Sequence, residues 1–232
     1  MLRFTRGKQI SIGVNGVPVL FMNLKWLGHA SWKLKAGGKT IYIDPYQGEY
    51  DEEADLILAT HSHSDHCEPS KVNLVKGEGT VIVAPADCAE KIGSPVESLK
   101  PGEKARYGEV EVEAVEAYNI KRFRSPGVPF HPQGLGVGYL IRAGGKTVYH
   151  VGDSGFITEM KDLKGIDLLL IPSGGTYTMD NEDAAEAAVT IRPKKTIPMH
   201  IWDTDPGKFK RNVEAVSDVL VMILRPGDTF DI

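Results

Sequence analysis

The sequence predicts one α/β (α+β) domain in which two β-sheets pack face to face. Short runs rich in Val, Ile, Leu and Tyr recur along both halves of the chain, bounded by Gly, Pro or Asp, as is typical of strands. Residues 32–42 and 139–149 repeat one pattern, a strand, Ala-Gly-Gly-Lys and a second strand. This repeat indicates either two related sheets or only a common hairpin turn. No linker or low-complexity stretch divides residues 1–232, so we expect a single domain.

The predicted elements alternate along the chain. Strands are expected at 17–26, 30–35, 39–44, 56–59, 80–83, 103–107, 110–117, 136–142, 146–151, 167–171, 195–199 and 219–223. Helices are expected at 70–76, 86–92, 181–191 and 207–217. Helix 181–191 has the clearest ends, because Asp180 or Asn181 can cap it and Pro193 stops it. Asn15-Gly16, between strand-forming residues, favours a tight hairpin turn.

Composition excludes several classes of protein. The chain is 41% hydrophobic and 25% charged, which is typical of globular proteins and unlike disordered or fibrous ones. A net charge of −4 disfavours a nucleic-acid partner. Two cysteines cannot form a disulfide framework, and no apolar stretch approaches the ~20 residues of a membrane span. Because no cleavage site follows residues 10–22, we expect a cytoplasmic protein.

The strongest functional signal is the segment Thr60-His61-Ser62-His63-Ser64-Asp65-His66. It follows the apolar run 56–59 directly, so it should leave the carboxyl end of a strand. In an extended chain His61 and His63 project to the same side. Three imidazoles and a carboxylate within six residues are ligands that suit a metal such as zinc.

This segment resembles the His-x-His-x-Asp-His signature of the metallo-β-lactamase superfamily. The resemblance runs from about Leu24 to His200 and includes Gly28-His29-Ala30-Ser31, Ile43-Asp44-Pro45, Gly152-Asp153-Ser154 and Pro198-Met199-His200. Through residues 130–139 and 172–179 the chain is similar to the L-ascorbate-6-phosphate-lactonase-like branch of metal-dependent hydrolases. The resemblance implies a four-layer αββα sandwich with the metals at the edge between the sheets.

The resemblance also implies a ligand set for two metal ions. His61, His63 and a later histidine would hold the first ion, Asp65, His66 and His200 would hold the second, and Asp153 would bridge both. The later histidine is His131 or His150. The repeat gives His150 a strand position equivalent to Ile43, whereas His131 precedes a strand as the ligand of the family does. We therefore expect His131.

The ligand set predicts a hydrolase with two divalent ions per chain, Zn²⁺ in the first place and Mn²⁺ as the alternative. Such a pair lowers the pKa of a bridging water from 15.7 toward ~7 and polarises the bond under attack. Asp65 would also orient this water or move its proton. We expect the resulting hydroxide to cleave an ester, lactone or phosphodiester of a small or lipid-like, phosphorylated substrate.

Other residues are candidates for supporting roles. Asp44 would fix the orientation of a ligand imidazole, because metal-bound histidines usually donate their second N–H to a carboxylate or carbonyl. His29 either approaches the site in the same role or is a core histidine.

One basic run, 121–124, lies in a long segment, 119–135, for which we expect no regular structure. Lys121, Arg122 and Arg124 would bind a phosphate if this segment covers the site, and would otherwise be solvated. Tyr177, in a Gly-Gly-Thr-Tyr turn, is a candidate substrate contact.

Three other functions compete with this interpretation. Gly152-Asp153-Ser154-Gly155 is superficially like a serine-protease motif, but Phe156 follows it and His61 and His63 stay unexplained. A nuclease of the same fold would require a broader basic surface. A non-catalytic metal-bound regulatory module should have lost a ligand, and all seven positions keep one. The sequence does not predict the oligomeric state.

Overall fold

A computed structural model describes residues 11–12, 18–19 and 22–232 of the chain. Near the N-terminus β1 (Ser11–Ile12) pairs antiparallel with β2 (Pro18–Val19), with Ile12 opposite Pro18. The Asn15-Gly16 turn that the sequence predicts lies outside the described residues.

The first sheet is built from the N-terminal half of the chain and one C-terminal strand. Within residues 22–232 its order is β17-β3-β4-β5-β6-β7. The strands are β3 (Asn23–Gly28), β4 (Ser31–Ala36), β5 (Lys39–Ile43), β6 (Ala54–Leu58), β7 (Lys76–Val83) and β17 (Thr229–Asp231). β5, β6 and β7 run parallel, so their carboxyl ends meet at one edge.

The second sheet comes from the C-terminal half, with the order β16-β15-β14-β13-β12-β9-β8 in the described chain. Its strands are β8 (Lys104–Tyr107), β9 (Val110–Ala117), β12 (Gly136–Ala143), β13 (Lys146–His150), β14 (Leu168–Pro172), β15 (Lys195–Met199) and β16 (Leu220–Val221). β13 to β16 are parallel, and β14, with all five residues buried, is a central strand.

The two copies of the internal repeat occupy equivalent hairpins in opposite sheets. β4 and β5 are joined by Gly37-Gly38, with Ala36 opposite Lys39, and β12 and β13 are joined by Gly144-Gly145, with Ala143 opposite Lys146. All four glycines have φ between 56° and 74°, the left-handed backbone that a two-residue hairpin turn requires. The prediction of two sheets of related build is therefore confirmed.

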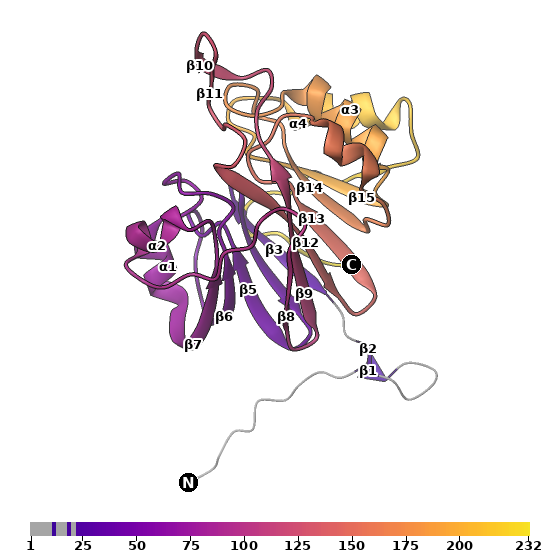
Figure 1. The fold of residues 1–232 in the computed structure, drawn as a ribbon. Helices are drawn as coiled ribbons and strands as arrows, with labels where there is room; N and C mark the ends of the chain where they lie inside the picture. Colours follow the sequence, from indigo (N-terminus) through magenta and orange to yellow (C-terminus); the bar gives the residue numbers. More distant parts are fainter. Residues whose placement is uncertain (1–10, 13–17, 20–21) are drawn as a thin grey trace.

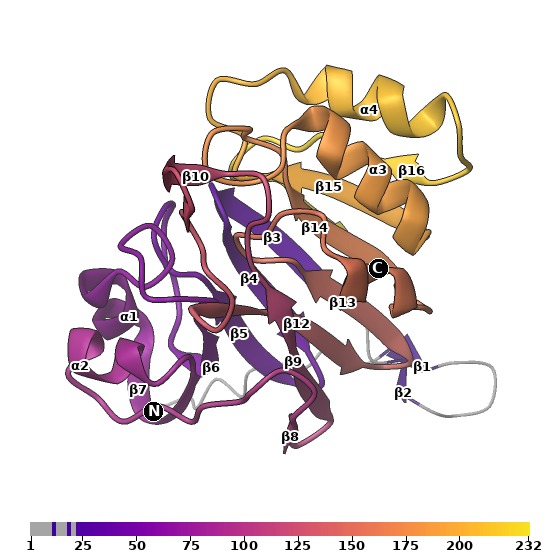
Figure 2. The same ribbon diagram turned by 45° about the horizontal axis from the view of Figure 1, so that its top comes forward.

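The sheets pack against each other and are covered by helices on their outer faces (Figures 1 and 2). Side chains of both sheets, among them Trp32, Ile43, Tyr139 and Leu170, form the central core. α1 (Pro69–Val75) and α2 (Asp87–Ile92) cover the first sheet. α3 (Asn181–Ile191), α4 (Pro206–Glu214) and the 3₁₀ helix η1 (Thr158–Asp162) cover the second. This is the predicted four-layer αββα sandwich.

Besides η1, two regions contain elements that the sequence does not predict. The segment 119–135 contains a short hairpin, β10 (Phe123–Ser125) and β11 (Val128–Pro129), and is not structureless. β10 is fully exposed, so no alternation of apolar residues marks it. β17 is only three residues long, yet it completes the first sheet, with Phe230 opposite Leu24. No helix in the described part of the chain has the length and apolar character needed to cross a membrane.

Candidate metal centre

The predicted ligands come together at one edge of the sandwich, where strands of both sheets end. The loop with His61, His63, Asp65 and His66 follows β6, and His200 follows β15 directly. Three further segments reach the same edge: the β3–β4 turn with His29, the segment after β11 with His131, and the segment after β13 with Asp153. Because parallel strands point their carboxyl ends to the same edge, residues far apart in sequence meet there.

A first cluster consists of His61, His63 and His131. The Nε2 atom of His61 lies 3.1 Å from Nδ1 of His63, and Nε2 of His131 lies 3.2 Å from the same atom. One ligand atom from each of the three residues falls within 4.8 Å of the others. The cluster thus offers three imidazole nitrogens to one point.

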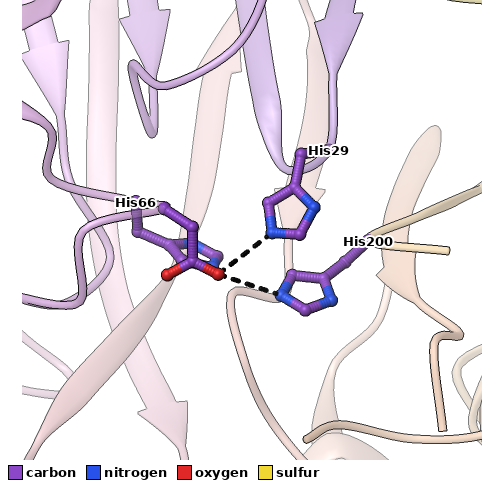
Figure 3. Close-up of side chains that lie close together, drawn as sticks. His29, His66 and His200 are labelled. Carbon is purple, nitrogen blue, oxygen red and sulfur yellow. Dashed lines mark hydrogen bonds and ion pairs between the residues drawn. The ribbon is translucent and has the colours of Figure 1, made fainter. Parts of the chain in front are cut away.

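A second cluster consists of His29, Asp65, His66 and His200, with ligand atoms that also lie within 4.8 Å of one another. Figure 3 shows the rings of His29, His66 and His200 gathered in one place. Oδ2 of Asp65 lies 3.2 Å from Nε2 of His29, 3.8 Å from Nε2 of His200 and 3.9 Å from Nε2 of His66. His29 therefore approaches the site, and is not a histidine of the core.

Asp153 lies between the two clusters and touches both. Its Oδ2 atom is 3.2 Å from Nε2 of His131 and 3.2 Å from Nε2 of His200, and its Oδ1 atom is 3.2 Å from Nε2 of His66. The side chain is 3% exposed, so this carboxylate is held away from water. Its place matches the bridging position that the sequence predicts.

His150, the alternative to His131, uses both ring nitrogens inside the protein. Its Nε2–H donates to the carbonyl oxygen of Ala30 at 2.9 Å, and its Nδ1 accepts from the backbone N–H of Gly152 at 3.2 Å. No nitrogen is left for a metal. The structure thus brings His131, and not His150, to the first cluster.

Two side chains orient the ligand imidazoles from behind. The Nδ1–H of His66 donates to Oδ2 of Asp44 at 2.7 Å, and Thr60 donates to Asp44 through its backbone N–H and its hydroxyl. The Nδ1–H of His131 donates to Oδ1 of Asn119 at 3.0 Å. Both bonds turn the Nε2 atoms toward the centre. The sequence predicted Asp44; it gave no local signal for Asn119, which lies twelve residues from its partner.

The backbone is held in an unusual conformation around the same centre. His29, Asp44, His200 and Trp202 have φ between 45° and 51°, the left-handed region that residues with a Cβ atom rarely adopt. Each of the four follows a strand end or lies within the turn beyond it. Such conformations concentrate at functional sites, where surrounding contacts hold them in place.

The first cluster is made of neutral imidazoles. Burial lowers the pKa of His61 well below its ordinary value and lowers the pKa of His131 to about 4. A neutral imidazole keeps a lone pair on one nitrogen, which is the form that binds a metal ion.

The second cluster carries more negative charge. Burial alone would raise the pKa of Asp153, but His200 and His66 hold it well below its usual range. Burial would likewise lower the pKa of His200, yet Asp153 and Asp65 raise it to about 9. Buried carboxylates need nearby positive charge, and a metal ion would supply it in place of these protons.

The residues present fit a pair of divalent cations. Nε2 of His66, Nε2 of His200 and Oδ1 of Asp153 are buried and make no hydrogen bond with the described residues. Buried polar atoms without partners are uncommon and require an explanation. Imidazole nitrogens and carboxylate oxygens around one centre suit Zn²⁺ and also Mn²⁺.

A cavity of about 390 Å³ opens onto this centre. Among the predicted substrate contacts, Arg124 and Tyr177 line it, whereas Lys121 and Arg122 do not. Lys121 forms an ion pair with Asp183 instead, and Arg122 pairs with Asp180 and Asp183. The prediction for these two cations is therefore corrected, because the sequence shows their charge but not their distant partners.

Three aromatic residues also line the cavity, and the sequence analysis did not identify them as substrate contacts: Tyr46, Phe130 and Trp202.

Comparisons with known proteins agree with this arrangement. The family model described as the beta-lactamase superfamily domain matches residues 23–200. A UPF0173 metal-dependent hydrolase of Thermococcus onnurineus is 35% identical over 231 residues, and one of Pelotomaculum thermopropionicum is 32% identical; each alignment covers 91% of this chain and 100% of the relative.

Solved structures give the same result. A crystal structure of a protein from Parabacteroides distasonis is 33% identical with a TM-score of 0.82, covering 89% of this chain and 94% of that one. Igni18, a metallo hydrolase from Ignicoccus hospitalis, is 26% identical with a TM-score of 0.76, covering 91% and 98%. The family model that matches residues 23–200 and the relatives aligned over their full length show that the chain belongs to the beta-lactamase superfamily, within the group named UPF0173 metal-dependent hydrolases.

Proposed function

We propose that the protein is a hydrolase that uses two divalent cations to cleave an ester, a lactone or a phosphodiester. The observation that carries this proposal is the convergence of six imidazole and carboxylate groups around Asp153, with buried nitrogens that make no hydrogen bond with the described residues. His61, His63 and His131 would hold one cation, Asp65, His66 and His200 the other, and Asp153 would contact both.

Cations bound there would lower the pKa of a water molecule toward neutrality and polarise the carbonyl or phosphoryl oxygen under attack. The chain itself orients the groups that hold them. Asp44 and Asn119 fix the rings of His66 and His131, so that little reorganisation is needed during the reaction. The Asp153 side chain is 3% exposed, so this carboxylate itself is shielded from bulk water.

Asp65 is suited to move the proton of the attacking water. Its Oδ2 accepts the N–H of His29, while its Oδ1 makes no hydrogen bond or ion pair with any described residue, and the side chain lines the cavity. As the water oxygen bonds to the carbonyl carbon or phosphorus, Oδ1 would take the proton and pass it to the leaving oxygen. No separate nucleophilic side chain is needed.

The cation pair and the reaction are tested together. Metal analysis of the purified protein should find about two ions per chain, zinc or manganese, and clearly fewer in His63→Ala. Asp65→Asn should lose most of the hydrolysis of a sugar-phosphate lactone or a model phosphodiester, assayed side by side with each metal restored. A protein without bound metal, or undiminished hydrolysis in Asp65→Asn, would contradict the proposal.

The choice of substrate follows from the resemblance of residues 130–139 and 172–179 to the ascorbate-phosphate-lactonase-like branch, and from Arg124, the cation that lines the cavity among the described residues. The net charge of −4 and the ion pairs of Lys121 and Arg122 favour a small molecule over a nucleic acid as the substrate. We propose a cytoplasmic location on the composition of the chain, which lacks a disulfide framework.

A further inference from the structure

An aromatic wall lines the cavity beside the metal centre, and at one end the ring of Trp202 lies 5.7 Å from that of His200, centroid to centroid. Phe130, Tyr177 and Trp202 come from three separate segments, and their rings follow one another: 4.9 Å between the centroids of Phe130 and Tyr177, and 5.9 Å between those of Tyr177 and Trp202. Tyr177 is 38% exposed and Trp202 55% exposed. Large aromatic side chains left open beside a polar centre are typical of a surface that binds a flat apolar group.

A single cation lies at the end of this wall. The guanidinium of Arg124 is 5.9 Å from the centre of the Phe130 ring, and no carboxylate of a described residue lies within 4.0 Å of it. Arg124 lines the same cavity as His63 and Asp65. A guanidinium on an aromatic face presents its N–H groups to an anion in a fixed plane.

Arg122, two residues earlier, is in contrast paired with other groups of the protein. Its guanidinium donates to the carbonyl oxygens of Gly175 and Thr178 and pairs with Asp180. These bonds join the segment that carries Arg124 and Phe130 to the segment that carries Tyr177. Arg122 thus acts as a positioning residue that holds the wall together, and Arg124 is the cation left free for a ligand.

We propose that the substrate carries, besides the bond that is hydrolysed, an aromatic ring with one anionic substituent, a carboxylate or a phosphate. The ring would lie against Phe130, Tyr177 and Trp202, and the anion would bind Arg124. This inference rests on the proposed hydrolase function and narrows its substrate class. A cavity of about 390 Å³ accepts a small molecule of this kind and leaves little room for a long acyl chain.

The acetate esters of three para-substituted phenols test this assignment on the zinc- or manganese-loaded protein: 4-carboxyphenyl acetate, 4-acetoxyphenyl phosphate and the neutral 4-carbamoylphenyl acetate. Acetate release, divided by the spontaneous rate of each ester, should give both anionic esters a kcat/KM about tenfold above that of the neutral one. Most of this preference should appear in KM. Arg124→Gln should reduce the ratio to about one.

Arg106→Gln is the matched control, since it removes an equal charge from β8, where Arg106 pairs with Glu111. It should keep the anionic preference. The kcat/KM values of the two anionic esters also show whether a carboxylate or a phosphate is the preferred substituent.

Ligand binding separates failure of this inference from failure of the hydrolase proposal. Trp26 and Trp32 are buried, so 4-hydroxybenzoate and 4-hydroxyphenyl phosphate should quench mainly the emission of Trp202, and Trp202→Phe should remove the signal. If neither these esters nor the lactone and the phosphodiester are cleaved, but the anionic phenols bind about tenfold more tightly than 4-hydroxybenzamide through Arg124, the ligand class stands and the hydrolase proposal fails. Equal binding, or a preference that survives Arg124→Gln, would overturn the inference.

Discussion

The two ligand clusters share Asp153 but differ in charge. The first consists of three imidazoles, and the amide of Asn119 orients one of them. The second contains the partly exposed carboxylate of Asp65, and the buried carboxylate of Asp44 orients His66. Because cations are attracted more strongly where negative charge is buried, we expect the second cluster to bind its ion more tightly than the first. One centre can therefore combine a firmly held ion with one that exchanges.

The largest effect is expected at Asp153, the residue that both clusters share. Asp153→Asn removes a charge that faces His66, His131 and His200 at once. We expect kcat/KM to fall by ~1000-fold or more, equal to about 4 kcal/mol. Metal analysis should show losses at both clusters. Retention of both ions with full activity would rule out a shared carboxylate.

Asp44→Asn tests mainly the second cluster, since Asp44 contacts His66 directly and reaches His61 of the first cluster only through the hydroxyl of Thr60. The variant weakens the bond that orients His66, and such partners are typically worth 10–100-fold in metal affinity. Competition with a chelator should show one ion released about 100-fold more easily, with a clearly smaller change for the other. Asp51→Asn is the matched control, because Asp51 pairs with Lys33 away from the centre. Equal weakening of both ions in Asp44→Asn would remove the distinction between the clusters.

Asn119→Ala is the corresponding test of the first cluster, with a smaller effect. An amide is a weaker acceptor than a carboxylate, so we expect about a tenfold loss of affinity for the more weakly held ion. Asn119→Asp keeps an acceptor for His131 and should restore the affinity. If the alanine variant binds both ions normally, the orientation of His131 does not depend on Asn119.

The smallest expected effect is the pH dependence of stability in the chelated protein. The pKa of His131 is lowered to about 4, so the unfolded chain binds more protons below pH 6.5 and stability falls between pH 6.5 and 4. The pKa of His200 is raised to about 9, so its contribution is present below pH 6.5 and is lost between pH 6.5 and 9. Thermal unfolding should show a maximum between these limits. His131→Asn should reduce the loss on the acid side, to which His61 also contributes, and His200→Asn the loss on the alkaline side, to which His66 also contributes.

The sequence predicts the motif-bearing part of this centre because its signal is local. His61, His63, Asp65 and His66 are contiguous, and the strand before them sets their position at the sheet edge. The two glycine-rich hairpins likewise reveal the paired sheets, because each turn is encoded in four residues.

Residues whose role depends on the meeting of distant loops could not be predicted in this way. Trp202 and Phe130 line one cavity from separate segments, and the charge of Arg122 is satisfied by Asp180, 58 residues away. Composition shows that a cation or a ring is present. It does not show which neighbour the fold will bring to it, and this is why Arg122 and Arg124 look alike in the sequence.

The left-handed residues at the strand ends have a consequence for the evolution of the protein. A residue with a Cβ atom loses about 1 kcal/mol in this conformation, a cost that glycine does not bear. Glycine at His29 or His200 would therefore relax the chain while removing a functional side chain. Selection for heat resistance and selection for catalysis would act in opposite directions at these positions.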